Sequence, residues 1–218
     1  MKAGPIIARA RLTLIDPDAV RWPDADLYKW LSDAQSTIAT LAPSSTSITG
    51  PVSLVAGTSQ TLPVQASLLL AAYRNTGSRA VRIVERELLD SYRPTWHTDP
   101  ATKDVQNYMF DPNLPQLFSV YPPNNGTGSL DMQYALQPVD VTQATDDLIT
   151  DDIYDVALLD FVLYRALQKD DDFAAGSQSE MYHKSFTELV ARADAMGVTT
   201  NPNLAMLGFA ENPREAAK

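Results

Sequence analysis

The fold is decided by residues 22–42, which read Trp-Pro-Asp-Ala-Asp-Leu-Tyr-Lys-Trp-Leu-Ser-Asp-Ala-Gln-Ser-Thr-Ile-Ala-Thr-Leu-Ala. Their apolar side chains recur three and four positions apart. At about 100° per residue these side chains fall within one stripe roughly 100° wide, while the opposite face is polar and carries no catalytic group. The stretch is therefore predicted to be a helix that docks through one face, formed by Leu27, Trp30, Leu31, Ala34, Ile38 and Leu41.

Prolines set the limits of this helix and of the one expected before it, over residues 5–15. Pro17 ends the first helix, because proline pushes the preceding residue out of the helical region. Pro23 opens the second helix and Pro43 ends it.

From residue 44 the apolar period changes from 3.6 to 2, which is typical of strands. A hairpin is expected over residues 52–63 with a turn at 56–58, and a short helix over 85–92. The Pro122-Pro123 pair is expected to stop the strand before it. The other expected strands, which complete a small and mostly antiparallel sheet of meander hairpins, are residues 46–49, 68–73, 79–84, 108–110, 117–121 and 130–136.

Two helices are predicted to close the fold, over residues 151–169 and 173–196. Apolar side chains spread round most of the first of these, so it should be buried on many sides. Its extra partner is either the chain's own core or a neighbouring subunit. Asp160 lies within this apolar region and needs a partner if it is buried. That partner is an arginine of the first helix or of the next subunit, unless Asp160 faces water.

The order of helices, then strands, then helices predicts an α+β fold. We expect an α-helical bundle body, made by the N-terminal and C-terminal helices, and a central small antiparallel β-hairpin or meander region. One domain should span residues 1–196, with helices in 1–43, a β-rich insertion in 44–137 and closing helices in 150–196. An irregular C-terminal tail, residues 197–218, is expected to dock on a partner.

Composition narrows the function. The 218 residues carry a formal net charge of −10, so the surface should repel nucleic acid, although DNA could still slide past it without binding. The absence of cysteine excludes disulfides and thiolate metal sites. No run approaches the ~20 apolar residues of a membrane helix. Arg9 and Arg11 interrupt the N-terminal apolar stretch, so we expect no secretory signal, no membrane contact and synthesis in the cytoplasm.

Residues suited to chemistry are few. The two histidines, His97 and His183, are too few for a zinc site, and no nucleophile motif accompanies them. Adjacent carboxylates occur at 146–147, 151–152 and 170–172, without the spacing of a calcium-binding loop. The sequence therefore predicts no catalytic, cofactor-binding or metal-binding residues and a protein that is not an enzyme. An enzyme that uses carboxylates and a divalent metal is the weaker alternative.

Several segments, in chain order, resemble the head-to-tail adaptor family of tailed bacteriophages, also described as connector or head-completion proteins. Together they span residues 5–195. The segments that carry the resemblance are residues 21–27 with 30–35, the hairpin at 52–63, the strand and helix at 79–89, Phe118-Ser119-Val120-Tyr121-Pro122-Pro123, and residues 151–166.

The resemblance implies a structural virion protein of the neck, with no catalytic residues to carry over. Such proteins form a homo-oligomeric ring, commonly of twelve copies, below the portal protein. The ring extends the channel for double-stranded DNA, which passes without sequence-specific binding, and docks the tail tube or nozzle protein. Another neck or tail component, such as a terminator or a tube-associated protein, is the alternative. The candidate interface residues are Trp22, Trp30, Leu31, Asp160, Phe161, Tyr164, Arg165, Met206 and Phe209.

Overall fold

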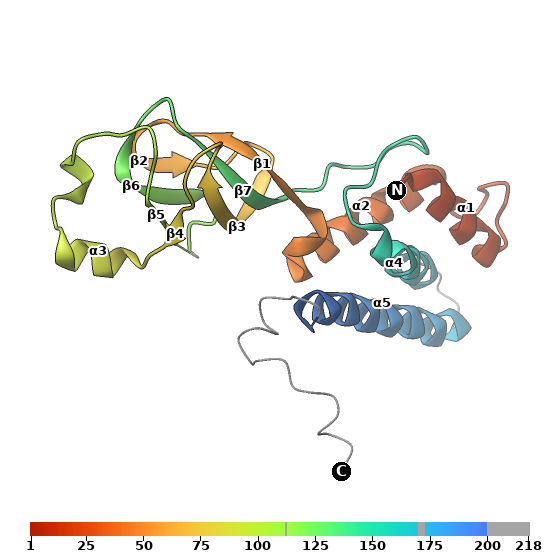
Figure 1. The fold of residues 1–218 in the computed structure, drawn as a ribbon. Coiled ribbons are helices and arrows are strands. Elements are labelled where there is room, and N and C mark those ends of the chain that lie inside the picture. Colours follow the sequence, from red (N-terminus) through yellow and green to blue (C-terminus); the bar gives the residue numbers. More distant parts are fainter. Residues whose placement is uncertain (112, 170–172, 200–218) are drawn as a thin grey trace, which may run out of the picture. The chain divides into compact units, whose positions relative to one another are not determined.

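The chain divides into two compact units, each with its own hydrophobic core, in a computed structural model that describes residues 1–111, 113–169 and 173–199. The helical unit comprises residues 1–42 together with the chain from Pro138 onward. The β unit comprises residues 43–137 (Figure 1). Helices and two sheets occur in one chain, which confirms the predicted α+β class.

Helix α4 is central to the helical unit, because it packs against each of the other three long helices. The chain's own helices thus account for the apolar circumference predicted for residues 151–169, with exposed side chains such as Val156 at its start. The predicted helices are confirmed, with shifts of a few residues at their ends. The helices are α1 (Ala3–Leu14), α2 (Asp24–Leu41), α4 (Asp155–Gln168) and α5 (Phe173–Thr199), and the 3-10 helix η3 (Asp152–Tyr154) precedes α4.

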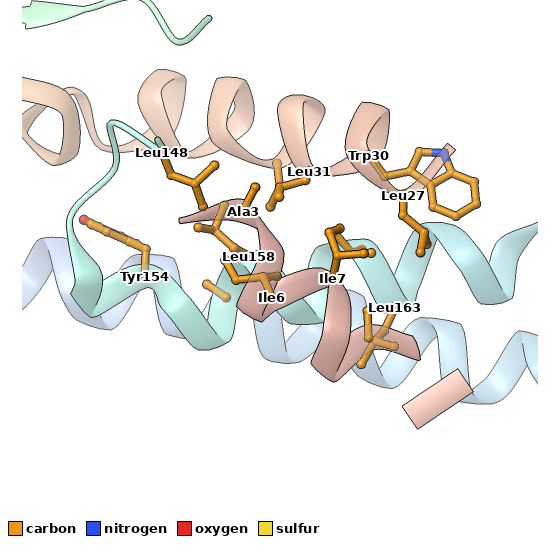
Figure 2. Close-up of a cluster of buried hydrophobic side chains, with 14 of the residues drawn as sticks. Ala3, Ile6, Ile7, Leu27, Trp30, Leu31, Leu148, Tyr154, Leu158 and Leu163 are labelled. Atoms are coloured by element: carbon orange, nitrogen blue, oxygen red, sulfur yellow. The ribbon is translucent and has the colours of Figure 1, made fainter. Parts of the chain in front are cut away.

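The core of this unit is formed by the stripe of α2 and by apolar side chains of α1 and α4 (Figure 2). Leu27 and Leu31 of α2 are fully buried, as are Ile6 of α1 and Leu158 of α4 to within 1%. Each such side chain contributes about 1.5–3 kcal/mol by leaving water. The docking face predicted for residues 22–42 is therefore buried inside the unit, except at Leu41, which is 55% exposed at the end of α2.

Helix α1 begins two residues earlier than Pro5. The loop before α4 accepts hydrogen bonds from the first backbone N–H groups of α1. Ala3 and Gly4 donate to the carbonyls of Asp146 and Ala144 at 3.1 and 3.0 Å. At its other end Ile15 adopts a left-handed conformation (φ +54°) and terminates the helix before Pro17.

The β unit contains two sheets, with strand orders β1-β7-β3 and β2-β6-β5-β4. The connections carry the 3-10 helices η1 (Pro43–Thr46) and η2 (Trp96–Thr98) and the short helix α3 (Arg86–Tyr92), which was predicted. The strands are β1 (Ser47–Ser53), β2 (Ala56–Thr61), β3 (Ala66–Asn75), β4 (Arg82–Ile83), β5 (Asn107–Phe110), β6 (Leu117–Asn125) and β7 (Ser129–Leu136).

The predicted meander of hairpins is wrong in its pairing. Residues 56–58 are strand rather than turn. β1 pairs antiparallel with β7, while β2 pairs antiparallel with β6, so the expected hairpin partners lie in different sheets. β4 and β5 pair in parallel. Alternation along the chain marks a strand, but the partner is decided by which buried faces fit together across long sequence separations.

Pro51, Pro122 and Pro123 lie within strands, although the expected strands end at residues 49 and 121, before these prolines. Pro51 is in β1, an edge strand, where a missing N–H can point away from the neighbour. Pro122 and Pro123 lie inside β6, where the pairing with β2 jumps from Ser119 to Asn124. The residues between have no partner in β2, so the two prolines occupy an irregularity of the ladder rather than end the strand.

Candidate functional site

The two histidines make structural contacts. His97 stacks on Trp96 with ring centroids 3.6 Å apart, and its Nδ1 lies 2.8 Å from Thr58 Oγ1. A catalytic role of His97 would be supported by a pair with Asp99. Asp99 instead pairs with Arg93 at 2.7 Å. His183 lies against the Tyr164 ring at 4.7 Å.

The carboxylate pairs stabilise the loop at residues 142–147 and form ion pairs with the N-terminal residues. Asp146 accepts hydrogen bonds from the backbone N–H of Thr142 and from Gln143, which hold the pKa of its carboxyl below the ordinary value. Lys2 pairs with Asp147 at 2.7 Å. Residues 170–172 lie outside the described part. Across residues 1–111, 113–169 and 173–199, no group of three or more His, Asp or Glu side chains is arranged to hold a metal ion.

Asp16 organises the turn after α1. Its buried carboxylate accepts backbone hydrogen bonds from Trp22, Val20 and Arg21 at 3.0, 2.9 and 3.2 Å. The bond from Trp22 contributes most to lowering the pKa of this carboxyl below its usual range, and Arg11 adds to the effect. The turn is thereby fixed in the geometry that delivers Trp22 to the core.

The candidate interface residues of the first two helices lie inside the helical unit. Trp22 is buried and donates its indole N–H to the carbonyl of Ala166 in α4 at 3.0 Å. Trp30 and Leu31 are buried in the same core. Their expected part in contacts between copies stays a prediction.

Asp160 is 7% exposed, and within the chain its partner is not the arginine expected from the first helix. A contact with an arginine of a neighbouring copy stays a prediction. Ser185 of α5 donates a hydrogen bond to its carboxylate at 2.6 Å. Arg9 of α1 forms its ion pair with Asp155 instead and acts on Asp160 only through its charge. Burial dominates and raises the pKa of Asp160 above its ordinary value.

The remaining candidates of α4 are partly buried. Phe161 lies edge-on to Phe186 of α5 at 5.0 Å, and Tyr164 also contacts α5 through His183. Arg165 donates to the Gln168 side chain at 3.4 Å. Their role between copies stays a prediction. Met206 and Phe209 lie outside the described residues.

We expect Asp160→Asn to raise the free energy of unfolding at neutral pH. The folded state holds the Asp160 proton more tightly than the unfolded chain, so the ionised group opposes folding above its raised pKa. This opposition fades as the pH falls through that pKa, and it is absent below the unfolded value near 3.8. The gain from the substitution should therefore disappear below about pH 4.

Urea unfolding of both proteins across pH 3–7 measures this effect. Ser185→Ala is the matched control: it removes the hydrogen bond that favours the ionised form, and should lower stability at neutral pH. A stability difference between Asp160→Asn and the parent that does not change with pH would contradict the assignment.

A projecting arm of the β unit, residues 82–99, was missed in the sequence. Helix α3 has no buried residue and stands off the strands (Figure 1). The arm is anchored by Trp96, which is fully buried, lies edge-on to Tyr121, and donates its indole N–H to Asp90 Oδ1 of α3 at 2.7 Å.

Beside the first turn of α3 the surface is hollowed to a volume of about 380 Å³. Both apolar and charged side chains line it. The residues that line it include Arg86, Glu87, Phe110, Leu114, Leu117 and Phe118. Leu114 is distant in sequence from α3, so the signal for this hollow is not local.

Comparison with protein families gives the class: the chain is a phage head-to-tail adaptor. It belongs to the SU10 adaptor protein family, whose sequence profile matches residues 1–204. The resemblance seen in the sequence is thereby confirmed. A comparison with curated proteins gives no match.

Membership has three consequences. The chain is a component of a phage virion, its partners are portal and tail components, and a structural rather than enzymatic role is indicated. Within the described ranges, no helix combines the length and apolar character needed to cross a membrane.

Proposed function

We propose that copies of this chain form a ring of twelve below the portal, extend the channel through which DNA passes, and dock the tail tube or nozzle. The observation that carries the proposal is the family match, which extends over both units of the chain. The contacts between copies are head-to-tail, since only such contacts close into a ring of more than two members.

The charge distribution supports this role. The residues of the helical unit, 1–42 and 138–218, include 11 Lys and Arg against 20 Asp and Glu, a net charge of −9. An acidic surface repels DNA phosphates and lets the duplex slide without binding. The acidic unit is therefore the part suited to face the channel.

The interface candidates fall into two roles under this proposal. Phe161, Tyr164 and Arg165 are partly accessible and contact a neighbouring copy. Trp22, Trp30, Leu31 and Asp160 set the positions of the helices behind them. The C-terminal segment, which contains Met206 and Phe209, binds the portal.

Electron microscopy of the full chain mixed with its portal protein tests the proposal. We expect a ring of twelve on the portal, and a variant ending at residue 199 should lose portal binding while its circular dichroism spectrum keeps the helical signal. A chain that stays monomeric at every concentration with portal present would contradict the proposal. A ring of different symmetry on the tail would instead indicate a terminator or a tube-associated protein.

A further inference from the structure

The two faces of α3 differ in kind. Successive side chains of a helix are about 100° apart around its axis. The mean direction of Arg86 and Glu87 is therefore about 170° from that of Leu88 and Tyr92. The first pair borders the hollow. The second pair projects into solvent, with Leu88 54% and Tyr92 86% exposed. One helix thus separates an apolar knob, Leu88 with Tyr92, from the hollow, which is partly lined by apolar side chains.

Two contacts connect the helix that carries the knob to the chain after it. Asp90, on the inner side of α3, accepts the indole N–H of the fully buried Trp96. Arg93 at the end of α3 pairs with Asp99 on the returning chain. Because these contacts restrain the helix before any partner arrives, binding through it loses less conformational freedom than binding through an unattached segment would.

The hollow has the chemistry to receive such a knob. Phe110, Leu114 and Phe118 are apolar lining residues that suit the bodies of a leucine and a tyrosine. The lining also includes Arg86, Glu87 and Asp111, which suit the polar tip of a tyrosine ring. The β unit also carries six Lys and Arg against seven Asp and Glu, a net charge of −1, so two β units meet with little repulsion.

Knob and hollow lie on opposite sides of one helix, so a single chain cannot bring them together. We propose that the knob of one copy inserts into the hollow of the next, and that this contact links adjacent β units around the ring. The contact is head-to-tail, so each copy uses its knob on one neighbour and its hollow on the other. This inference rests on the proposed ring.

The contact is too small to hold two free chains. An aromatic side chain buries about 150–250 Å², whereas a stable pair needs a total near 1,200–2,000 Å². The knob should therefore dock only where other contacts already align the copies. We therefore expect the knob of a neighbouring copy to occupy the hollow only after the chains have assembled on the portal.

The chain contains no cysteine, so introduced cysteines give a clean test. A disulfide needs Cβ atoms about 3.5–4.5 Å apart. The full chain with Tyr92→Cys and Leu114→Cys is assembled on the portal, oxidised and run on a non-reducing gel. We expect a ladder of covalent dimers, trimers and higher species. Each single variant should give no ladder, since a head-to-tail contact does not bring identical positions together.

The matched control is Val64→Cys with Leu114→Cys, because Val64 is fully exposed in the same unit but lies outside the knob. It should give no ladder. Tyr92→Glu should lower the number of complete rings at least tenfold without changing the melting temperature, because the side chain is exposed.

The outcomes separate the two proposals. Rings in the microscope without a ladder overturn the knob-and-hollow contact and leave the ring standing. Dimers from Tyr92→Cys alone indicate a two-fold contact and also overturn it. Cross-linking of Tyr92→Cys only to a tail component shows that the occupant is a different protein. Absence of both rings and ladder overturns the ring as well.

Discussion

Trp96→Ala is expected to lower the free energy of unfolding of the β unit by about 3–5 kcal/mol. The side chain is fully buried, and its removal leaves a cavity beside Tyr121. It also deprives Asp90 of its indole donor and His97 of the ring on which it stacks. Because Trp96 connects the arm to the sheet, the loss should be greatest in residues 82–99 and β6.

Hydrogen exchange of peptides from the arm and from β6 measures this loss at the place where it arises. Tyr92→Ala is the control, because that side chain is 86% exposed and its truncation should change stability by less than about 0.5 kcal/mol. Equal exchange rates in Trp96→Ala and the parent would show that the arm is not anchored through this residue.

Leu158→Ala should destabilise the helical unit by about 2–5 kcal/mol. Leu158 is completely buried (0% exposed). It lies on α4, the helix that packs against α1, α2 and α5. The same cost should be measured at every protein concentration, because the contacts that are lost lie within one chain.

Urea unfolding of the unassembled chain at two concentrations, tenfold apart, checks both parts of this expectation. Val156→Ala in the same helix is the control, since Val156 is 48% exposed and should cost far less. A small effect of Leu158→Ala on the free chain, with a large effect only after assembly, would mean that the core face of α4 is completed by a neighbour.

Helices were predictable because their signals are local. The stripe of residues 22–42 and the prolines at 23 and 43 specify α2 locally, and the helix is found within two residues of the expected bounds. Strands were recognised for the same reason, as with β7. Their partners were not predicted, because pairing β1 with β7 joins segments about 80 residues apart, and no pattern within either strand specifies the other.

In the candidate site, too, the features with a local sequence signal were predictable and those that depend on the folded structure were not. The need of Asp160 for a partner follows from its apolar neighbours in sequence, but the identity of that partner depends on the register of α4 against α5, which places Ser185 opposite it. The knob had a local signal, an apolar pair four residues apart in a short helix. The hollow did not, because Leu114 and Leu117 reach α3 only through the folded sheet.

A reconstruction of the neck of the native phage particle by electron microscopy tests the central claim most directly. The account predicts twelve copies of this chain in one closed ring between portal and tail, with the α3 arm of each copy against the next β unit. Density that places the chain away from the portal vertex, or copies that do not touch one another, would contradict it.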